Sequence, residues 1–288
     1  MQRDPVKPGA DSREHPKLVS GGGRACSARR IAHRLGTVHW DPMKTAERIL
    51  VVATELFNER GERNVTASDI ALELDISPGN LYYHYKGKDD ILSSLFSQCY
   101  RELAGMLATP ILEDAFLEDS NPLERSWLFL TVLMEVMYQY RFLYLNQSDL
   151  MQRYPEIDRG MTRLLSLKRQ TTKQLAAALL ASVDINAHPQ RLEHVADSMA
   201  MTLMYWLSFE HLTGSPQTPQ QTIHRAVLQV LSHCAPYLGE QQTDFYRECE
   251  LIDARLLDTH SPMSYYSESS SPAPTHPAGW SFILIRSF

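Results

Sequence analysis

A short segment around residue 80 carries side chains whose chemistry suits the reading of DNA. The Asn80 amide can form two hydrogen bonds with the edge of an adenine, and Gly79 lets a backbone approach closely. The Tyr83 hydroxyl and the Lys88 ammonium can donate to phosphate oxygens. The full set of predicted DNA contacts is Thr66, Ser68, Ser77, Pro78, Gly79, Asn80, Tyr82, Tyr83, His84 and Lys88.

Two short helices joined by a tight turn are predicted to hold these side chains. The spacing Thr66-x-x-Asp69 puts a hydroxyl cap before an acid in the first turn, which is typical of a helix start. After a three-residue turn, Ser77 is the expected N-cap and Pro78 the first residue of the next helix. That second helix is predicted to run to Tyr85.

The second short helix, 78–85, has an inner and an outer face. At about 100° per residue, Leu81 and Tyr85 point toward the neighbouring helices, whereas Asn80 and Tyr83 point away. A short exposed helix after a tight turn is the helix-turn-helix arrangement, whose second helix enters the major groove of DNA. Neighbouring tyrosines on a helix also fit simple packing, so a helical protein without DNA binding is the alternative.

Helices on both sides are expected to complete this domain. A helix before the motif ends at Gly61, and a long one after Gly87 begins with acids at its positive end. Their apolar residues recur with helical spacing at Ile49, Val52, Ala53, Leu56 and Phe57, and then at Ile91, Leu92, Leu95, Phe96, Cys99 and Leu103.

The rest of the chain is predicted to be helical as well. Five or six further helices are expected after Pro110, and no segment alternates long enough to suggest a sheet, so the fold class is all-α. We expect a disordered basic extension at 1–42, a DNA-binding domain at 43–103, a helical effector-binding and dimerisation domain at 104–258, and a disordered tail at 259–288. Either the natural start is Met43 or the extension is an arm for the minor groove.

Composition narrows the class of protein. No apolar run is long enough to cross a membrane and no secretory signal is visible, so a soluble, cytoplasmic protein is expected. The four cysteines show no paired spacing for a disulfide framework or a zinc site. The net charge is −6, which argues against general affinity for nucleic acid and requires that DNA binding rest on a local arrangement.

The segment Val65 to Ile91 resembles the signature of the TetR family of bacterial regulators, including the block Leu81-Tyr82-Tyr83-His84-Tyr85. The resemblance covers about 43–103. It implies that Tyr83, His84 and Lys88 touch phosphates, while Gly79, Asn80 and Tyr82 lie near base edges. It departs at Pro78, where the family often has lysine, and at Tyr85, where phenylalanine is frequent. The family also implies a repressor, a homodimer and a palindromic operator.

The resemblance further implies that the last two long helices, 189–213 and 218–238, form the dimer interface. Each carries an apolar stripe, and the alternative is that these stripes belong to the core of the single chain. The stripes are Val195, Met199, Leu203, Trp206 and Leu207 on the first helix and Ile223, Val227, Val230, Leu231 and Cys234 on the second.

An aromatic and methionine-rich segment, 127–144, is the predicted effector pocket. Such side chains adapt to apolar ligands, and Gln139 and Arg141 are candidates for fixing a polar end. A plain aromatic core is the alternative. The predicted pocket residues are Trp127, Met134, Met137, Tyr138, Arg141, Phe142 and Tyr144.

The sequence gives no support for an enzymatic function. It contains no G-x-S-x-G, H-E-x-x-H or G-x-x-x-x-G-K motif, and its histidines are scattered through predicted helices. We therefore expect no catalytic residues, no cofactor and no metal. The expected partners are an operator in double-stranded DNA, a small-molecule effector and a second copy of the chain.

Overall fold

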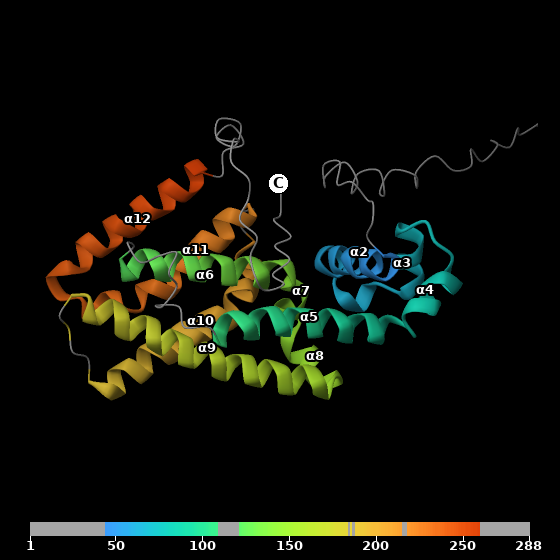
Figure 1. Ribbon diagram of the computed structural model, residues 1–288, viewed down its shortest axis with the longest axis horizontal. Helices are drawn as coiled ribbons and strands as arrows, with labels where there is room; N and C mark the ends of the chain where they lie inside the picture. The colour runs from blue at the N-terminus through green and yellow to red at the C-terminus, as the bar shows by residue number, and fades with distance from the viewer. Residues whose placement is uncertain (1–43, 109–120, 184, 186–187, 215–217, 260–288) are drawn as a thin grey trace, which may run out of the picture. The chain divides into compact units, whose positions relative to one another are not determined.

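The computed structural model describes residues 44–108, 121–183, 185, 188–214 and 218–259 (Figure 1). Within these ranges every regular element is a helix, which confirms the all-α prediction. The elements, with η for a short 3-10 helix, are α2 (Thr45–Arg60), η1 (Glu62–Asn64), α3 (Ala67–Glu73), α4 (Pro78–His84), α5 (Lys88–Ala108), α6 (Pro122–Gln139), α7 (Arg141–Leu145), α8 (Gln147–Arg153), α9 (Pro155–Ala181), α10 (Pro189–Thr213), α11 (Pro219–Ser232), η4 (Ala235–Tyr237), η5 (Gly239–Gln241) and α12 (Gln242–Thr259). The predictions for 1–42 and for the tail beyond Thr259 fall outside the described residues.

Helices α2, α3 and α4 form the head of the molecule around buried apolar side chains. Leu56 of α2, Ile70 of α3 and Leu81 of α4 are each fully buried. Gly61 ends α2 with a φ of 78°, a backbone conformation that favours glycine, and its N–H donates to the Phe57 carbonyl. The predicted helices of the head are therefore confirmed, including their inner faces.

Helix α4, the second short helix of the predicted motif, ends one residue earlier than predicted. Tyr85 lies just beyond it in an extended conformation. Its side chain still faces inward as predicted, because the hydroxyl donates to the Ala46 carbonyl of α2 at 3.2 Å. This bond attaches the end of α4 to the first helix of the head.

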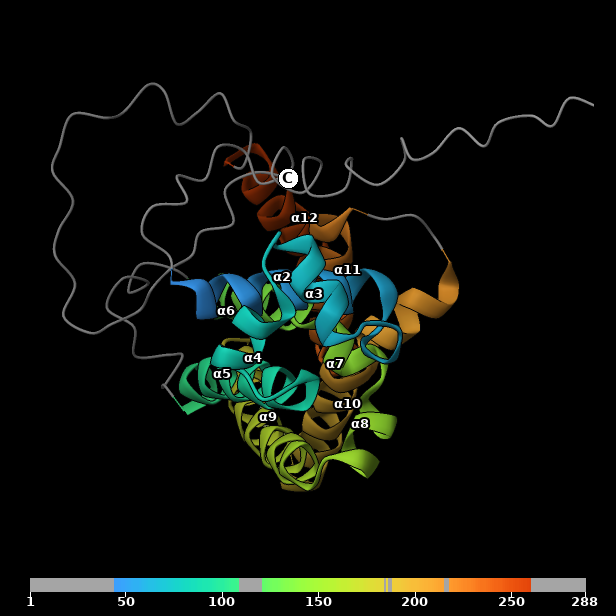
Figure 2. The same cartoon turned by 90° about the vertical axis from the view of Figure 1, so that its right-hand side faces the viewer.

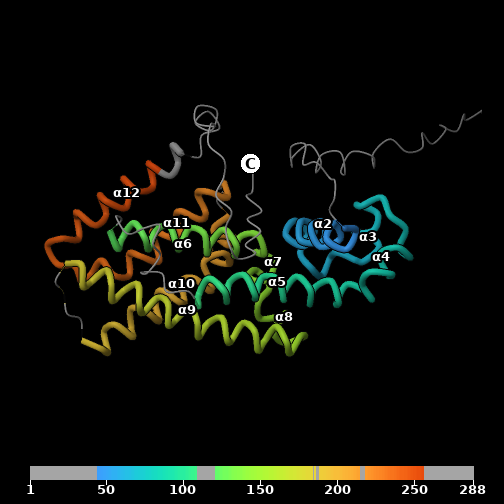
Figure 3. The backbone as a smooth tube through the Cα atoms, viewed as in Figure 1, coloured from blue at the N-terminus to red at the C-terminus, as the bar shows by residue number. Residues whose placement is uncertain are grey.

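The long helix α5 leads from the head to the C-terminal helices (Figure 3). It packs along α9, and Figure 2 looks nearly along both helices. Gly160 of α9 makes their close approach possible, since a Cβ at that position would overlap the Phe96 ring of α5. A ring fitted against a glycine leaves little room for α5 to slide along α9.

The C-terminal bundle is built mainly from α6, α9, α10 and α11. Helix α10 packs along α9, and α11 packs along α6 (Figure 1). Among the described residues seven α-helices follow α5, more than the five or six predicted. The extra breaks fall at Tyr140 and Asn146, which leave the helical region without a proline or glycine to signal it.

The predicted dimer stripes on α10 and α11 prove to be core of the chain itself. Every residue of the two stripes is at most 7% exposed and joins the continuous apolar cluster of the molecule. The alternative interpretation of these stripes is therefore the correct one. Helix α10 has a second apolar row on its exposed side, at Met201, Tyr205, Phe209 and Leu212.

No helix in the described part of the chain is long and apolar enough to span a bilayer.

Candidate DNA interface and effector groove

The turn between α3 and α4 is fixed by local hydrogen bonds. Asp75 adopts a left-handed conformation with φ 54°, and the Ile76 N–H donates to the Ala71 carbonyl at 3.0 Å, which ends α3. The Ser77 hydroxyl then accepts the Asn80 N–H at 3.2 Å, and Pro78 occupies the first helical position. The capping roles predicted for Ser77 and Pro78 are thus confirmed, and they set the angle at which α4 leaves the turn.

The outer side of α4 is open to solvent. Tyr83 is 85% exposed and Tyr82 is 52% exposed, and Gly79 and Asn80 are exposed as well. We call these four residues the reading face. His84 is half-buried and packs edge-on against Tyr83, with ring centroids 5.1 Å apart. The structure therefore gathers the predicted contacts of α4 on one accessible surface beside the exposed Ser77 and Pro78.

At the start of α3, the two predicted hydroxyl contacts differ in what they are free to do. Thr66 Oγ1 donates to Asp69 Oδ2 at 2.6 Å and accepts the Asp69 N–H at 3.2 Å. These hydrogen bonds hold the pKa of Asp69 below its usual range, so its carboxylate stays charged. Ser68 is exposed and its hydroxyl makes no hydrogen bond to the described residues, which leaves this hydroxyl available to a phosphate.

Lys88 is engaged inside the molecule. Its ammonium lies 3.0 Å from Oε1 of Glu62 and donates to the Glu62 backbone carbonyl at 3.1 Å. Contact with a phosphate would require Lys88 to leave this partner. Lys86, which the sequence analysis passed over, is exposed and forms no ion pair with any described residue. Its position just after α4 could have identified Lys86 as a candidate phosphate contact from the sequence.

One connection joins the head to the bundle through Asn58 of α2. The Asn58 amide donates to the Gln139 carbonyl at 2.7 Å and accepts the Phe142 N–H at 3.0 Å. The Phe57 ring meets the Phe142 ring edge-on, with centroids 5.3 Å apart. Head and bundle are therefore bonded where α6 gives way to α7.

A second connection is a set of ion pairs around Glu62, which is only 1% exposed. Arg153, at the end of α8, donates to Glu62 Oε2 at 2.5 Å and lies 2.8 Å from Asp149 of the same helix. Arg63 of the head also pairs with Asp149. Buried Glu62 of the head thus holds one cation from the start of α5, Lys88, and one from the end of α8, Arg153.

Next to these ion pairs, a phenol and a carboxylate extend the connection. The Tyr154 hydroxyl, at the junction of α8 and α9, donates to Asp89 at the start of α5 at 2.6 Å. Burial of the hydroxyl, and then this hydrogen bond, raise the pKa of Tyr154 above its usual value. The phenol therefore stays a donor at neutral pH and keeps α5 attached to the end of α8.

Two family models match the chain over both of its parts. The one described as bacterial regulatory proteins, tetR family, matches residues 49–95. The one described as bacterial transcriptional repressor, also TetR, matches residues 102–246, which is half of the chain. The chain belongs to the TetR family.

Similar proteins agree with this assignment. A TetR-family transcriptional regulator of Marinobacter aquaeolei VT8 has 26% identity and a TM-score of 0.62, over 73% of this chain and 99% of that one. A gamma-butyrolactone receptor, described as ArpA-like, shows the same fold with a TM-score of 0.51 at 12% identity, over 73% of this chain and 96% of its own.

Curated relatives match only a short part of the chain. HTH-type transcriptional regulators of Staphylococcus aureus strains bovine RF122 and USA300 are 41% identical over 51 residues, 18% of this chain. The match spans 28% of the length of those relatives. The family is a class of regulators rather than of enzymes.

In this TetR-family chain, the predicted effector residues lie mostly in the packed core. Trp127, Met134, Met137, Phe142 and Tyr144 are at most 1% exposed. The Trp127 indole nitrogen and the Tyr144 hydroxyl are buried without a hydrogen-bond partner. Whether these residues bind an effector stays a prediction, but two of them hold unused hydrogen-bonding groups.

The two residues predicted to fix the polar end of an effector, Arg141 and Gln139, contact other groups of the protein instead. Arg141 stacks over the Tyr138 ring, with its guanidinium carbon 4.8 Å from the ring centroid. Burial lowers the pKa of Arg141, and the same side chain donates to the Tyr138 carbonyl at 3.4 Å. Gln139 is exposed and contributes its backbone carbonyl to Asn58.

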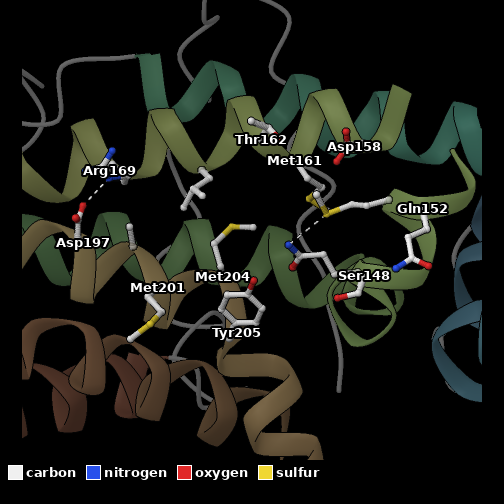
Figure 4. A pocket seen from close by; sticks show the side chains of 14 residues that line it. Ser148, Gln152, Asp158, Met161, Thr162, Arg169, Asp197, Met201, Met204 and Tyr205 are labelled. Carbon is white, nitrogen blue, oxygen red and sulfur yellow. Dashed lines mark hydrogen bonds and ion pairs between the residues drawn. The ribbon is translucent and has the colours of Figure 1, made fainter. Parts of the chain in front are cut away.

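A groove of about 750 Å³ opens between α8, α9 and α10. None of the predicted effector residues lines it. Its apolar walls include Met151 of α8, Met161 and Leu165 of α9, and Met201 and Met204 of α10. Figure 4 shows Met161 and Met204 projecting into the space between α9 and α10. The sequence analysis missed this methionine-rich groove because its walls come from three separate helices, and residues of α8 and α10 that face it are about 50 positions apart in the chain.

The bundle also contains a fully buried lysine, Lys168 of α9. Its ammonium lies 3.3 Å from the Met204 sulfur and 5.0 Å from the centroid of the Tyr144 ring. No carboxylate among the described residues pairs with it. The signal was available in the sequence, since Lys168 interrupts the row of buried residues that runs along α9 from Met161 through Leu164 to Leu175.

Proposed function

We propose that the chain is a sequence-specific DNA-binding transcriptional regulator, a repressor that a largely apolar small molecule releases from a palindromic operator. The observation that carries the proposal is the reading face of α4, because it presents two large tyrosines and an asparagine to solvent on a helix fixed by Ser77 and Leu81. Exposed aromatic and amide side chains on such a helix are suited to phosphates and base edges.

A homodimer follows from the second apolar row of α10. Met201, Tyr205, Phe209 and Leu212 are 54% to 83% exposed and follow one side of the helix for three turns. Met201 and Tyr205 also border the groove, so Phe209 and Leu212 form the part of the row that lies outside it. A row of this size favours a protein contact, and an isologous contact between two copies would present two reading faces to a palindrome. The proposed interface therefore lies on α10, within the range 189–213, but on the side opposite the buried stripe.

The effector is proposed to act through α8. One side of this seven-residue helix lines the groove with Gln147, Ser148 and Met151, and its other residues Asp149 and Arg153 pair with the head. A ligand that shifts α8 would therefore move the ion pairs around Glu62. Such a ligand releases DNA only if it binds the released conformation more tightly than the DNA-bound one.

Substitutions on the reading face should weaken operator binding and leave the fold intact. Tyr83→Ala is expected to lower affinity about ten-fold or more, without changing the unfolding temperature, because the side chain is 85% exposed. A gel-shift titration against the intergenic DNA beside its own gene, at two salt concentrations, measures this. Unchanged binding by Tyr83→Ala would favour the alternative of a helical interaction or scaffold protein.

The two lysines after α4 form a matched pair for the same titration. Lys86→Ala is expected to reduce the dependence of log affinity on log salt by about one phosphate contact. Lys88→Ala gives an equal reduction only if Lys88 leaves Glu62 in the complex. A change for neither lysine would remove both from the interface.

Charges placed on the exposed row of α10 should dissociate the dimer. Phe209→Glu with Leu212→Glu removes two large apolar side chains from each copy of the interface. At roughly 2 kcal/mol of burial free energy for each side chain, the dimer should lose several kcal/mol of stability. Light scattering of the full chain at micromolar concentration should then report a monomer. Leu251→Glu, on an exposed apolar residue of α12, is the control and should leave the mass unchanged.

A further inference from the structure

A buried lysine without a counterion is an unusual feature of the bundle. Lys168 is 0% exposed, and a lysine in the protein interior is normally paired with a carboxylate. Among the described residues, its ammonium donates a hydrogen bond to the Met204 sulfur at 3.3 Å, which is a weak acceptor. Three N–H donors therefore lie in the interior with almost nothing to donate to.

The acidic groups near Lys168 do not supply the missing charge. The Cys99 thiol of α5 is close enough to influence the charge of Lys168. Burial raises the pKa of Cys99 above its usual value, so the thiol stays uncharged at neutral pH. Burial likewise raises the pKa of the Tyr144 hydroxyl of α7. The helices packed against Lys168 thus provide a neutral thiol, a neutral phenol and a thioether.

Two further buried polar atoms, one next to this lysine and one at the groove, are unused. The Tyr144 hydroxyl is buried without a hydrogen-bond partner, on a ring whose centroid is 5.0 Å from the Lys168 ammonium. The Oε1 atom of Gln147 is also buried without a partner, and Gln147 lines the groove. Unsatisfied buried groups are rare in folded proteins and each needs an explanation.

Met204 separates the buried ammonium from the groove. Its side chain contacts Lys168 and also lines the groove, into which it projects in Figure 4. Methionine is flexible and changes rotamer readily. A ligand in the groove can therefore displace the thioether and place an acceptor against the ammonium.

We propose that Lys168 and Tyr144 receive the acidic head group of the effector, which is an organic carboxylate carried on an apolar chain or ring. The carboxylate would accept hydrogen bonds from the ammonium and the phenol, and the methionine walls of the groove would hold the apolar body. This inference rests on the proposed function only in calling the ligand an effector. The binding of a carboxylate at this site does not depend on DNA release.

Two matched pairs of probes test the site directly: dodecanoate against dodecan-1-ol, and 1-naphthoate against 1-naphthalenemethanol. Calorimetry with the full chain and no DNA should show that at least one acid binds more tightly than its alcohol. Lys168→Met is expected to lower the affinity for that acid about ten-fold or more, while the affinity for the alcohol stays unchanged. Lys173→Met is the control, since Lys173 lies on the same helix but pairs with Glu193 at the surface.

Either of two results would overturn the inference. In one, neither acid binds better than its alcohol, which includes the case in which no probe binds. In the other, Lys168→Met binds the acid as tightly as the unchanged protein. Operator release is measured separately with the same probes. An acid that binds through Lys168 but leaves the DNA complex intact would refute release by this ligand and keep the site.

Discussion

Replacing Lys168 by methionine is expected to stabilise the protein against unfolding, and to do so more at pH 6 than at pH 9. Methionine has a similar length and buries no charge, so the free-energy cost of keeping the ammonium in the apolar bundle disappears. Burial lowers the pKa of Lys168 from its ordinary value near 10.5 to about 7.

The sign of the pH dependence follows from proton binding. Between the folded and unfolded pKa values the unfolded chain binds more protons, so Lys168 adds stability at high pH that is lost as the pH falls toward 7. Lowering the pH from 9 to 6 should widen the advantage of Lys168→Met by about 2 to 3 kcal/mol. Urea unfolding at both pH values measures it.

The comparison with Lys173→Met removes effects common to the whole chain. Lys173 is 44% exposed, so its replacement should change the free energy of unfolding little, and equally at both pH values. An advantage of Lys168→Met that is the same at pH 6 and pH 9 would show that the buried lysine does not titrate between them. A loss of stability would show that the ammonium has a partner, and the proposed carboxylate site would lose its basis.

The head could be predicted closely because its signals are local. Ser77 and Pro78 alone mark where α4 begins, as its N-cap and its first residue. The helical period alone then puts Leu81 and Tyr83 on opposite sides of α4. The same reasoning identified Gly61 as the end of α2. Nothing from outside the head was needed to orient the reading face.

The bundle was harder to predict because its helices carry apolar residues on more than one side. On α10, both Leu203 and Phe209 belong to apolar rows, and the sequence does not show which row meets the core. The groove depends on Met151, Met161 and Met204, which come together only when three separate helices pack. Periodicity within one segment cannot reveal such a site.

The partner of Lys88 was missed for a related reason. Glu62 precedes the motif and carries no pattern that singles it out, yet it is 1% exposed and pairs with Arg153 of α8. The two are 91 residues apart in the chain. An ion pair of that separation leaves no pattern in a single sequence, although it determines what Lys88 is free to contact.

Removing both cations from Glu62 is expected to destabilise the protein strongly. In the double variant Lys88→Met with Arg153→Met, the Glu62 carboxylate would lie buried without a counterion, which typically costs about 3 to 5 kcal/mol. Part of this cost is relieved if water reaches the side chain, so about 3 kcal/mol is the expected loss. Urea unfolding of the two single variants and the double variant measures it, with the double variant losing the most.

A third substitution separates the buried charge from the lost packing. Adding Glu62→Met to the double variant should recover most of the lost free energy, because no unpaired charge remains in the interior. Arg247→Met is the control, since Arg247 and Asp244 form an exposed ion pair whose loss should change stability by less than about 1 kcal/mol. If the triple variant stays as unstable as the double one, the cations stabilise the head through packing, and α8 is joined to the DNA-binding helices by shape rather than by charge.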